Sequence, residues 1–462
     1  MMKKLINKFL IIGSLILILL GQKTAFCEQV PMDQYKQDYL QACKLIANKY
    51  IYLEQKLGIS RTDFYQQCAT YADTVDWGSG KPQFVREIRK LRSKFNDGHF
   101  NWELDNQLAS DSSYFLGFIM TMGKDGNVYV GRIYNTFGTD LAPGDQILSW
   151  NGKDIHDEID QFSNLIPQST KLSSKEVATR RSTTEYSWQP LRDNLEPVRL
   201  IYIKPDGQIK EELLTWKKYD ASTKIQYVHD DSKLFLTNNS FPSLEEIPSD
   251  VQYIHSSLLY FFRTIAGQKV AVLHVRQFYN WDTNDLDSTF EKILAGHPEI
   301  LVIDLKDSAG GQTKNMIALS SILNIQKDYR VYKETIAVKT GNKHSRMINF
   351  SEEVAESYDL DFKNIWRGKT ILRINSICGS CGDQFARWFQ LNKRGQIIGF
   401  PSAGRWGDCN TYTLKNTKTK IDFPFGNEYS SEDKSMEGIG VKPDDITGDT
   451  LDSALEKLIG DN

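Results

Sequence analysis

The sequence predicts an α/β protein built from a helical segment, a β-rich module and a larger α/β core. Between residues 32 and 95, apolar residues recur at intervals of three and four, which is the spacing of one helix face. Short alternating segments separated by glycine turns follow from about residue 110 to residue 217, as in the strands of a sheet. From residue 268 onward, strand-like and helix-like segments alternate, and this order is typical of parallel βαβ units.

The composition limits the class of protein. The chain has 462 residues, of which 40% are hydrophobic and 25% charged, so it is long enough to bury more than one core. This excludes a disordered, a collagen-like or a polytopic membrane protein. With 56 Lys and Arg against 59 Asp and Glu, the formal net charge is -3. Because no strong positive field results, we expect no nucleic-acid partner.

The N-terminus carries the pattern of an export signal. Lys3, Lys4 and Lys8 precede the apolar run Phe9–Leu20, which is shorter than the about 20 residues that a membrane-spanning helix needs. We therefore expect residues 1–27 to be a cleaved signal peptide. The mature protein is then exported, without a stable membrane span, to the periplasm or the extracellular medium. The sequence does not separate these two locations.

Five cysteines remain after this cleavage, so at least one thiol stays unpaired. Export exposes thiols to oxidation. Cys43 and Cys68 fall on neighbouring predicted helices of the expected helical cap, residues 28–108. Two alternatives remain open for this pair: a disulfide that joins the helices, or two buried free thiols.

The other boundaries follow from changes in pattern. The β-rich module is expected at residues 109–217. Residues 218–267 mix charges with Ser, Pro and aromatics and show little periodicity, so we expect a connector, and the sequence leaves open whether it is inhibitory. The core then occupies residues 268–462. Its expected strands are 270–275, 300–305, 370–374 and 396–399, and its expected helices are 285–294, 314–323 and 382–391.

Ser380 is the first candidate for chemistry, because active groups in such sheets lie where strands end and helices begin. It stands directly after one expected strand of the core and directly before an expected helix. A hydroxyl on that turn can attack a carbonyl while the amide of Cys381 holds the developing oxyanion. The alternative is a serine that only caps the helix.

Two further candidates could complete the same chemistry. Gly310 and Gly311 follow another expected strand and could supply a second oxyanion donor, although such a pair is often an ordinary turn. His99 closes the helical cap in an Asp-Gly-His turn, and a serine needs such a base to remove its proton. An isolated histidine can instead be a surface or capping residue. No zinc-type spacing occurs, so we expect neither a metal nor another cofactor.

The β-rich module resembles a PDZ domain. The resemblance rests on Phe115-Leu116-Gly117-Phe118 and on the run from Pro143 to Gly152. PDZ domains bind an extended peptide by strand addition and hold its carboxylate on backbone amides, which implies peptide binding at Leu116, Gly117 and Phe118. The alternative is a spacer barrel with a common turn sequence.

Taken together, the landmarks resemble the C-terminal-processing (tail-specific) serine protease family with its crotonase-like core. They are Asp97-Gly98-His99, the PDZ-like module, VIDLKDSAGG, NSICGSCGDQFA, GFPSAGRWG and MEGIGVKPD, and they keep the family's order along nearly the whole mature chain. The resemblance implies a serine peptidase with protein or peptide substrates. It leaves the substrate and the oligomeric state open, with a homodimer among the options.

The resemblance also indicates a branch of this family. One branch uses a lysine base in a Gly-Lys-Gly-like turn, but here that turn contains Arg405, which cannot act as a base. The other branch, with the tricorn core protease and the chlamydial protease-like activity factor, implies Ser380 as nucleophile, His99 as base and Glu437 as the carboxylate. Gly98 stands where tricorn-like sites have a serine, so Glu437 must act directly or through another group.

Two rival functions remain. Cys378 and Cys381 form a CxxC motif between a strand and a helix, which resembles the motif of thioredoxin-type oxidoreductases. The second rival is an inactive protein of the same fold that binds peptide or lipid. A serine-reactive probe separates this second rival from the peptidase, because a binding protein would not be labelled at Ser380.

Overall fold

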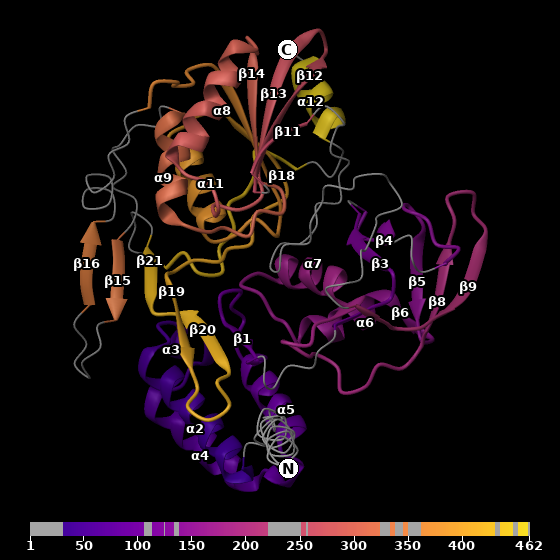
Figure 1. Cartoon of the computed structure of the whole chain (residues 1–462), viewed down its shortest axis with the longest axis vertical. Coiled ribbons are helices and arrows are strands. Elements are labelled where there is room, and N and C mark those ends of the chain that lie inside the picture. Colours follow the sequence, from indigo (N-terminus) through magenta and orange to yellow (C-terminus); the bar gives the residue numbers. More distant parts are fainter. Residues whose placement is uncertain are drawn as a thin grey trace, which may run out of the picture.

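The structure is a computed structural model in which a helical part, a β module and an α/β core surround a common centre (Figure 1). It describes residues 31–105, 113–123, 125–133, 138–219, 251–255, 257–323, 333–337, 345–349, 362–429, 435–446 and 451–460. The predicted signal peptide, residues 1–27, lies outside these ranges. Among the helices that are described, none is both long and apolar enough to cross a bilayer.

The helical part contains the helices that the apolar spacing predicts. They are α2 (Met32–Lys49), α3 (Leu53–Leu57), α4 (Arg61–Thr74), the short η1 (Trp77–Ser79) and α5 (Lys81–Arg92). Their apolar faces form one core that includes Tyr39, Ile46 and Phe84. Cys43 on α2 and Cys68 on α4 are both buried in this core as free thiols, which is the second of the two alternatives.

A small antiparallel sheet joins this helical part to the C-terminal region. Its strands lie in the order β1 (Asn101–Glu103), β20 (Lys420–Pro424), β19 (Cys409–Thr413). Phe423 and Leu414 bury their side chains in the core of the helical part. In Figure 1 the hairpin of β19 and β20 extends from the α/β core onto the helices. Because His99 lies two residues before the start of β1, this pairing fixes the histidine next to the C-terminal region.

The β module contains an antiparallel sheet in the order β3-β4-β5-β8-β9, with β6 paired to β5. A second small sheet has the order β10-β2-β7, and α7 lies against β3. The bounds are β2 (Ser113–Phe115), β3 (Phe118–Met122), β4 (Val128–Ile133), β5 (Gln146–Trp150), β6 (Lys153–Asp154), α6 (Ile155–Ser163), α7 (Lys171–Arg181), β7 (Thr184–Glu185), β8 (Val198–Ile203), β9 (Ile209–Leu214) and β10 (Lys217–Tyr219).

The α/β core is organised around a seven-stranded sheet in the order β11-β12-β13-β14-β17-β18-β22. From β13 to β22 neighbouring strands are parallel, as the alternation of elements predicts. The bounds are β11 (Gln252–His255), β12 (Leu258–Ile265), β13 (Gln268–Val275), α8 (Thr283–Ala295), β14 (Ile300–Asp304), α9 (Thr313–Ile322), β17 (Lys369–Ile374), α11 (Cys381–Leu391), β18 (Gln396–Gly399), β22 (Asp445–Ile446) and α12 (Leu451–Gly460). A separate sheet has the order β16-β15-β21, with β15 (Lys333–Ala337), β16 (Ser345–Asn349) and β21 (Gly426–Tyr429).

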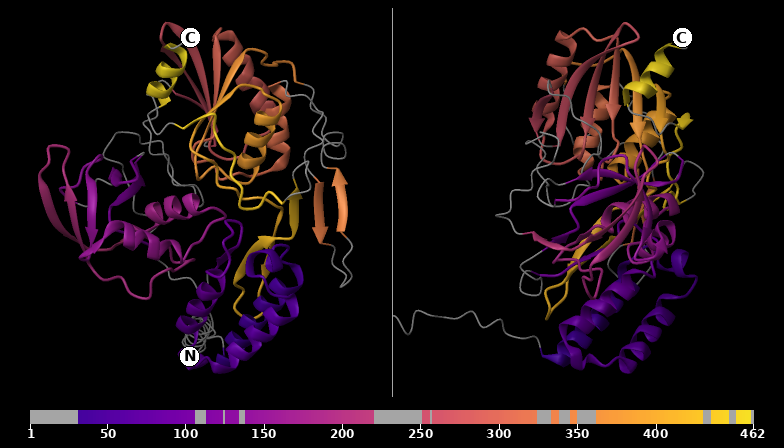
Figure 2. Two further views of the ribbon diagram at one scale, coloured as in Figure 1. Left: turned by 180° about the vertical axis from the view of Figure 1, so that it is seen from behind. Right: turned by 90° about the vertical axis from the view of Figure 1, so that its right-hand side faces the viewer.

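Helices cover both faces of this large sheet. Helices α8, α9 and α11 pack on one face, where Leu273, Ile303 and Leu372 point. Helix α12 packs on the other face against Val272 and Val302. The side view in Figure 2 places α12 and α8 on opposite sides of the sheet. Because both faces are buried, the central strands are almost continuously apolar.

The expected connector at residues 218–267 is wrong for part of that range. Residues 220–250 lie outside the described residues. Strands β11 and β12, however, belong to the large sheet, and β12 pairs with β13 along its whole length. The first four side chains of β12 are all buried. The sequence of this strand therefore lacks the alternation of polar and apolar residues by which a strand is recognised.

Candidate active site

Ser380 sits on a strained turn between β17 and α11. Its φ of 58° and ψ of -125° are unusual for a residue with a side chain, and such strain concentrates at functional turns. The serine occupies the N-cap position of α11, but its side chain makes no capping hydrogen bond. Ser380 therefore does not act as a simple helix cap. The N–H of Ser380 donates to the carbonyl oxygen of Arg405 at 3.0 Å. This hydrogen bond ties the serine turn to a different segment of the chain.

Gly310 lies directly beside Ser380. A Cβ atom on Gly310 would lie 2.5 Å from the Ser380 Cβ and 3.0 Å from the amide nitrogen of Cys381. Only glycine fits at that distance, and the φ of 94° at Gly310 also favours it. Gly311 packs differently, because a Cβ there would meet the backbone of Phe278. Of the two predicted oxyanion glycines, Gly310 is the one against the serine and the start of α11.

A buried ion pair holds the loop that carries Gly310. Nη2 of Arg180, on α7 of the β module, lies 2.9 Å from Oδ1 of Asp307, and both side chains are only 3% exposed. The Asn375 amide also donates to Asp307 at 2.7 Å, and the Asp307 N–H donates back to Asn375 at 3.0 Å. Burial alone would raise the pKa of Asp307, but the Arg180 guanidinium holds it below its usual value. The β module therefore helps to fix the glycine loop.

His99 is placed in the tautomer and charge state of a general base. Its Nδ1 lies 3.2 Å from the carbonyl oxygen of Trp406. A carbonyl only accepts, so Nδ1 carries the proton and Nε2 is left with a lone pair. The backbone N–H of His99 donates to Oδ1 of Asp97 at 2.8 Å, which fixes the turn. Burial lowers the pKa of His99, so the imidazole is neutral near pH 7.

Glu437 also lies beside Trp406, but its carboxylate contacts groups other than the His99 ring. Its Oε2 accepts from the backbone N–H of Trp406 at 3.0 Å, and its Oε1 lies 2.8 Å from Nζ of Lys56. Within the described residues, Glu437 makes no direct hydrogen bond with His99. Burial, followed by the nearby Asp97, raises the pKa of Glu437 to about 8, and Lys56 opposes this rise.

The three predicted catalytic residues thus meet on one short stretch of backbone. The Ser380 N–H binds the carbonyl of Arg405, His99 binds the carbonyl of Trp406, and Glu437 binds the N–H of Trp406. Serine, histidine and carboxylate are far apart in the sequence, and the segment Arg405–Trp406 brings them together. The arrangement has the components that a serine needs for nucleophilic attack: a strained turn, a neutral imidazole and a nearby carboxylate.

Asp383 fixes this backbone stretch from within α11. Its carboxylate accepts from the N–H groups of Gly404 at 3.1 Å and Arg405 at 2.8 Å, and from the hydroxyl of Ser402. Burial raises the pKa of Asp383 to about 7. The residue lies one turn after Ser380, so it connects the nucleophile's helix to the loop that meets His99.

The Arg405 side chain accounts for two glycines of the site. A Cβ atom on Gly98 would lie 2.2 Å from Cδ of Arg405, and one on Gly379 would lie 2.3 Å from its Nε. The guanidinium also donates to the carbonyl of Ile377 at 2.7 Å. Arg405 therefore passes between the histidine turn and the serine turn, and a larger residue at position 98 would collide with it.

The thiols near Ser380 lack the properties of a redox pair. Cys378 is fully buried, and burial raises the pKa of its thiol well above the usual value. A redox motif requires the opposite shift at its first cysteine. The Cys381 thiol is 3% exposed and donates to the carbonyl of Gly311 at 3.0 Å. These environments favour packing roles over thiol exchange.

The residues predicted to bind peptide lie at the edge of the β module. Strand β3 begins at Phe118 and is the terminal strand of its sheet. Leu116 and Phe118 bury their side chains in the module's core, and Gly117 has a φ of 93°. The Leu116 amide donates to the carbonyl of Thr183 at 3.1 Å, so that amide is already engaged.

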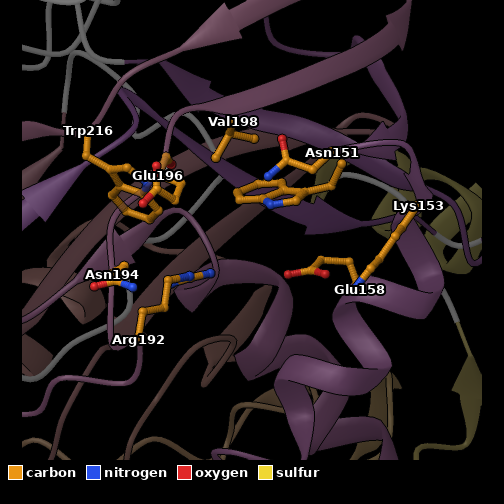
Figure 3. Close-up of a pocket in the computed structure, with 9 residues that line it drawn as sticks. Asn151, Lys153, Glu158, Arg192, Asn194, Glu196, Val198 and Trp216 are labelled. Atoms are coloured by element: carbon orange, nitrogen blue, oxygen red, sulfur yellow. Dashed lines mark hydrogen bonds between the residues drawn. The ribbon is translucent and has the colours of Figure 1, made fainter.

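A separate cavity of about 250 Å³ opens in the β module (Figure 3). Its walls include the indoles of Trp150 and Trp216 and the charged side chains of Glu158 and Arg192. The guanidinium carbon of Arg192 lies 5.1 Å from the ring centroid of Trp216. None of the residues predicted from the sequence for catalysis or peptide binding lines this cavity, so it is not part of the candidate active site.

Sequence reasoning missed three residues that shape the site. Arg180 makes a buried ion pair and Lys56 a partly buried one, each with a residue far along the chain, and no spacing rule reveals such contacts. Trp406 contributes its backbone N–H and C=O to these contacts, and every residue except proline has both groups, so the residue type gives no signal. Only the turn containing Trp406 gave a signal, since the family resemblance already marked that position.

Comparison with known proteins shows which families and folds this chain resembles. Residues 269–447 match peptidase family S41. The tail-specific protease of Haemophilus influenzae is 23% identical over 145 residues, which cover 31% of this chain and 19% of that protein. This chain thus spans far less than two thirds of that curated relative. The match confirms the predicted resemblance to the processing proteases and classes the matched region with the serine-type peptidases.

Solved structures show the same fold over nearly the whole chain. The structure of mature CPAF complexed with lactacystin has a TM-score of 0.70 at 16% sequence identity, and the match covers 93% of this chain and 98% of that chain. A second structure of mature CPAF also has a TM-score of 0.70, at 93% and 96% coverage. The helical part, the β module and the α/β core therefore occur together in that protein as well.

Proposed function

Because residues 269–447 match peptidase family S41, we propose that this protein is an exported serine endopeptidase that cleaves peptide bonds through an acyl-enzyme. The observation that carries the proposal is the meeting of Ser380, His99 and Glu437 on the backbone of Arg405–Trp406. The neutral state of His99 and its Nδ1 hydrogen bond support its role as the base.

In the proposed first step, Nε2 of His99 takes the proton from the Ser380 hydroxyl as its oxygen attacks the peptide carbonyl. The carbonyl π electrons move to the oxygen, and the oxyanion is held by the amide of Cys381 and by that of Gly310 or Gly311. The close approach of Gly310 to Ser380 favours Gly310 of the two. The carbonyl of Trp406 and the carboxylate of Glu437 stabilise the positive imidazolium.

The intermediate then collapses and the carbon–nitrogen bond breaks. The imidazolium of His99 gives its proton to the leaving amine, which departs as the first product. Water next attacks the acyl-enzyme, with His99 as the base again, and releases the second product and free Ser380. Every proton is thus returned, and the cycle requires no metal or cofactor.

The remaining assignments are proposals of the same kind. We assign the α/β core to the crotonase-like type and the β module to the PDZ-like type. An extended peptide would add to the free edge of β3, near Leu116, Gly117 and Phe118, which is supported by the edge position of that strand. Residues 1–27 would direct export to the periplasm or the medium. Protein or peptide substrates are expected, and a homodimer is open to test by solution scattering.

The test is mass spectrometry of protein substrates incubated with purified wild-type protein, Ser380→Ala and the control Ser163→Ala. Ser163 lies on α6 of the β module, where its hydroxyl donates to its own helix. We expect the wild type and the control to produce the same new peptide termini, and Ser380→Ala to produce none above background. No cleavage by the wild type, with binding of the same peptides, would instead identify a binding protein of this fold.

A further inference from the structure

Lys56 is a partly buried cation at the proposed active site that the mechanism above does not use. It lies in α3, and its Nζ donates to the carbonyl of Asn96 and to Oε1 of Glu437, the latter at 2.8 Å. The side chain of Lys56 is 12% exposed and that of Glu437 is fully buried. A lysine in such a place costs desolvation energy, so its position calls for a physical explanation.

We infer that Lys56 is a positioning residue of this peptidase, and that Glu437 acts on His99 electrostatically across the backbone of Trp406, without direct contact. The inference rests on the proposed function and specifies how the carboxylate serves it. Lys56 favours the charged form of Glu437 and holds the carboxylate in the orientation that faces the N–H of Trp406. Nζ of Lys56 donates to Asn96 and Glu437, which are not the reacting groups.

The peptide group between residues 405 and 406 and the one between 406 and 407 flank the same Cα of Trp406. Its N–H donates to Oε2 of Glu437 at 3.0 Å, and its C=O accepts from Nδ1 of His99 at 3.2 Å. The hydroxyl of Tyr52 donates to the same carbonyl at 3.4 Å. Since these are two separate peptide groups, Glu437 acts on His99 through space, and charges interact more strongly in a low-dielectric interior than in water. The negative charge of Glu437 is therefore felt at His99 without direct contact.

This arrangement matters most when His99 takes a proton. The imidazolium then carries a full positive charge in a buried place, where it interacts more strongly with charges than in water. An ionised Glu437, which lies on the other side of the Trp406 backbone, stabilises the imidazolium. A protonated Glu437 carries no charge and does not. The charge state of Glu437 therefore controls how readily His99 acts as a base.

Lys56 favours the ionised state of Glu437. Burial and Asp97 raise the pKa of Glu437 to about 8, and Lys56 opposes this rise. Without Lys56 the pKa of Glu437 would rise further, so the ionised form would be still rarer near pH 7 and would appear only at higher pH. The other titratable or charged groups that act on Glu437 or His99 are Tyr50, Asp97, Arg405, Asp408 and Cys409.

The alternative is a purely structural ion pair that ties α3 to the segment around Glu437. Such a pair would change the free energy of unfolding, but it would leave the pH dependence of turnover in the folded enzyme unchanged. The two roles therefore differ in the shape of the pH profile of kcat.

The experiment compares wild type, Lys56→Met, Lys56→Arg and the control Lys36→Met. Lys36 belongs to the same helical part and pairs with Asp73 on the surface. Active enzyme is counted by titration with a fluorophosphonate, and kcat and KM for a cleaved peptide are measured from pH 5 to pH 10. We expect Lys56→Met to lower kcat at pH 7 by roughly tenfold to a hundredfold, within what base catalysis supplies, with KM little changed.

The pH profile of kcat distinguishes the positioning role of Lys56 from a purely structural one. We expect the acid limb of kcat for Lys56→Met to move to higher pH, with activity recovered as Glu437 ionises. Lys56→Arg should restore most of the turnover, and Lys36→Met should match the wild type. At pH 7, adding Glu437→Gln to Lys56→Met should cause no further loss, and it should abolish the recovery at high pH. If Lys56→Met does not fold, Lys56→Gln, which keeps a donor without the charge, serves in its place.

The failing outcomes differ from one another. An unshifted profile for folded Lys56→Met, or full additivity with Glu437→Gln, would overturn the role of Lys56 while the peptidase function stands. Absence of both labelling and cleavage in the wild type would overturn the proposed function, and the role of Lys56 would fall with it.

Discussion

Replacing Gly310 by alanine tests the placement of the glycine loop against the nucleophile. The new Cβ would lie 2.5 Å from the Ser380 Cβ and 2.6 Å from the carbonyl oxygen of Gly379, both far inside contact distance. These neighbours are the backbone and Cβ of a strained turn, so they cannot yield like the end of a flexible side chain. Either the glycine loop or the serine turn must move.

The expected magnitude has two parts. Alanine at a φ of 94° costs about 1–2 kcal/mol as a left-handed residue, and overpacking adds about 1–3 kcal/mol. Gly207→Ala separates the two, because Gly207 has a φ of 88° and no atom within 4 Å of its added Cβ. Gly207→Ala should therefore show only the loss of stability that comes from the left-handed backbone, without the overpacking cost.

The activity should respond more strongly than the stability. Loss of one oxyanion donor lowers kcat by about 10²–10³-fold, so we expect a fall of that order for Gly310→Ala and none for Gly207→Ala. Thermal unfolding and peptide hydrolysis measure the two effects on the same samples. Equal kcat values for the two variants would refute the contact between Gly310 and Ser380.

Three further predictions follow from the buried charges and thiols. Arg180→Met should destabilise the protein by roughly 3–5 kcal/mol in urea unfolding because it leaves the Asp307 carboxylate buried without its ion-pair partner, whereas Arg199→Met, at a fully exposed pair, should cost far less; equal losses would contradict this. His99 must be neutral to act and its pKa is lowered, so its imidazole should titrate below pH 6.5 when followed by NMR, and titration above that value would be inconsistent with the buried imidazole. Cys378→Ala should retain peptide hydrolysis, and the wild type should not catalyse insulin reduction; reduction that disappears in the variant would favour the oxidoreductase.

The sequence predicted best what depends on local pattern. The alternation of strands and helices in the core appears with boundaries that differ by a residue or two, as in α9 and β17. The position of Ser380 after a strand and before a helix was also readable, because the turn is local. The order of the landmarks indicated a resemblance to the processing proteases, and the match of residues 269–447 to peptidase family S41 and the similarity to a tail-specific protease confirmed that resemblance.

Other features depend on partners far along the chain. Strand β12 was missed because burial on both faces removes the alternation that marks a strand. The pair of Lys56 and Glu437 joins α3 to a segment near the C-terminus, and no short-range signal reports it. The separation of Cys43 from Cys68 likewise depends on how α2 and α4 pack.

The position of Gly98 shows a third kind of limit. The sequence marks it as a departure from tricorn-like sites, but it does not give the reason. The reason is the Arg405 side chain, which occupies the space beside it. Two unusual residues thus explain each other only in three dimensions.

The rate at which a fluorophosphonate labels Ser380 tests the central claim most directly, because it needs no knowledge of the substrate. The account predicts that the label is found on Ser380 in the wild type, and that His99→Ala slows labelling by about 10²–10⁴-fold near pH 7. Equal labelling rates in the two proteins, or a label on another residue, would contradict the claim that this imidazole activates this hydroxyl.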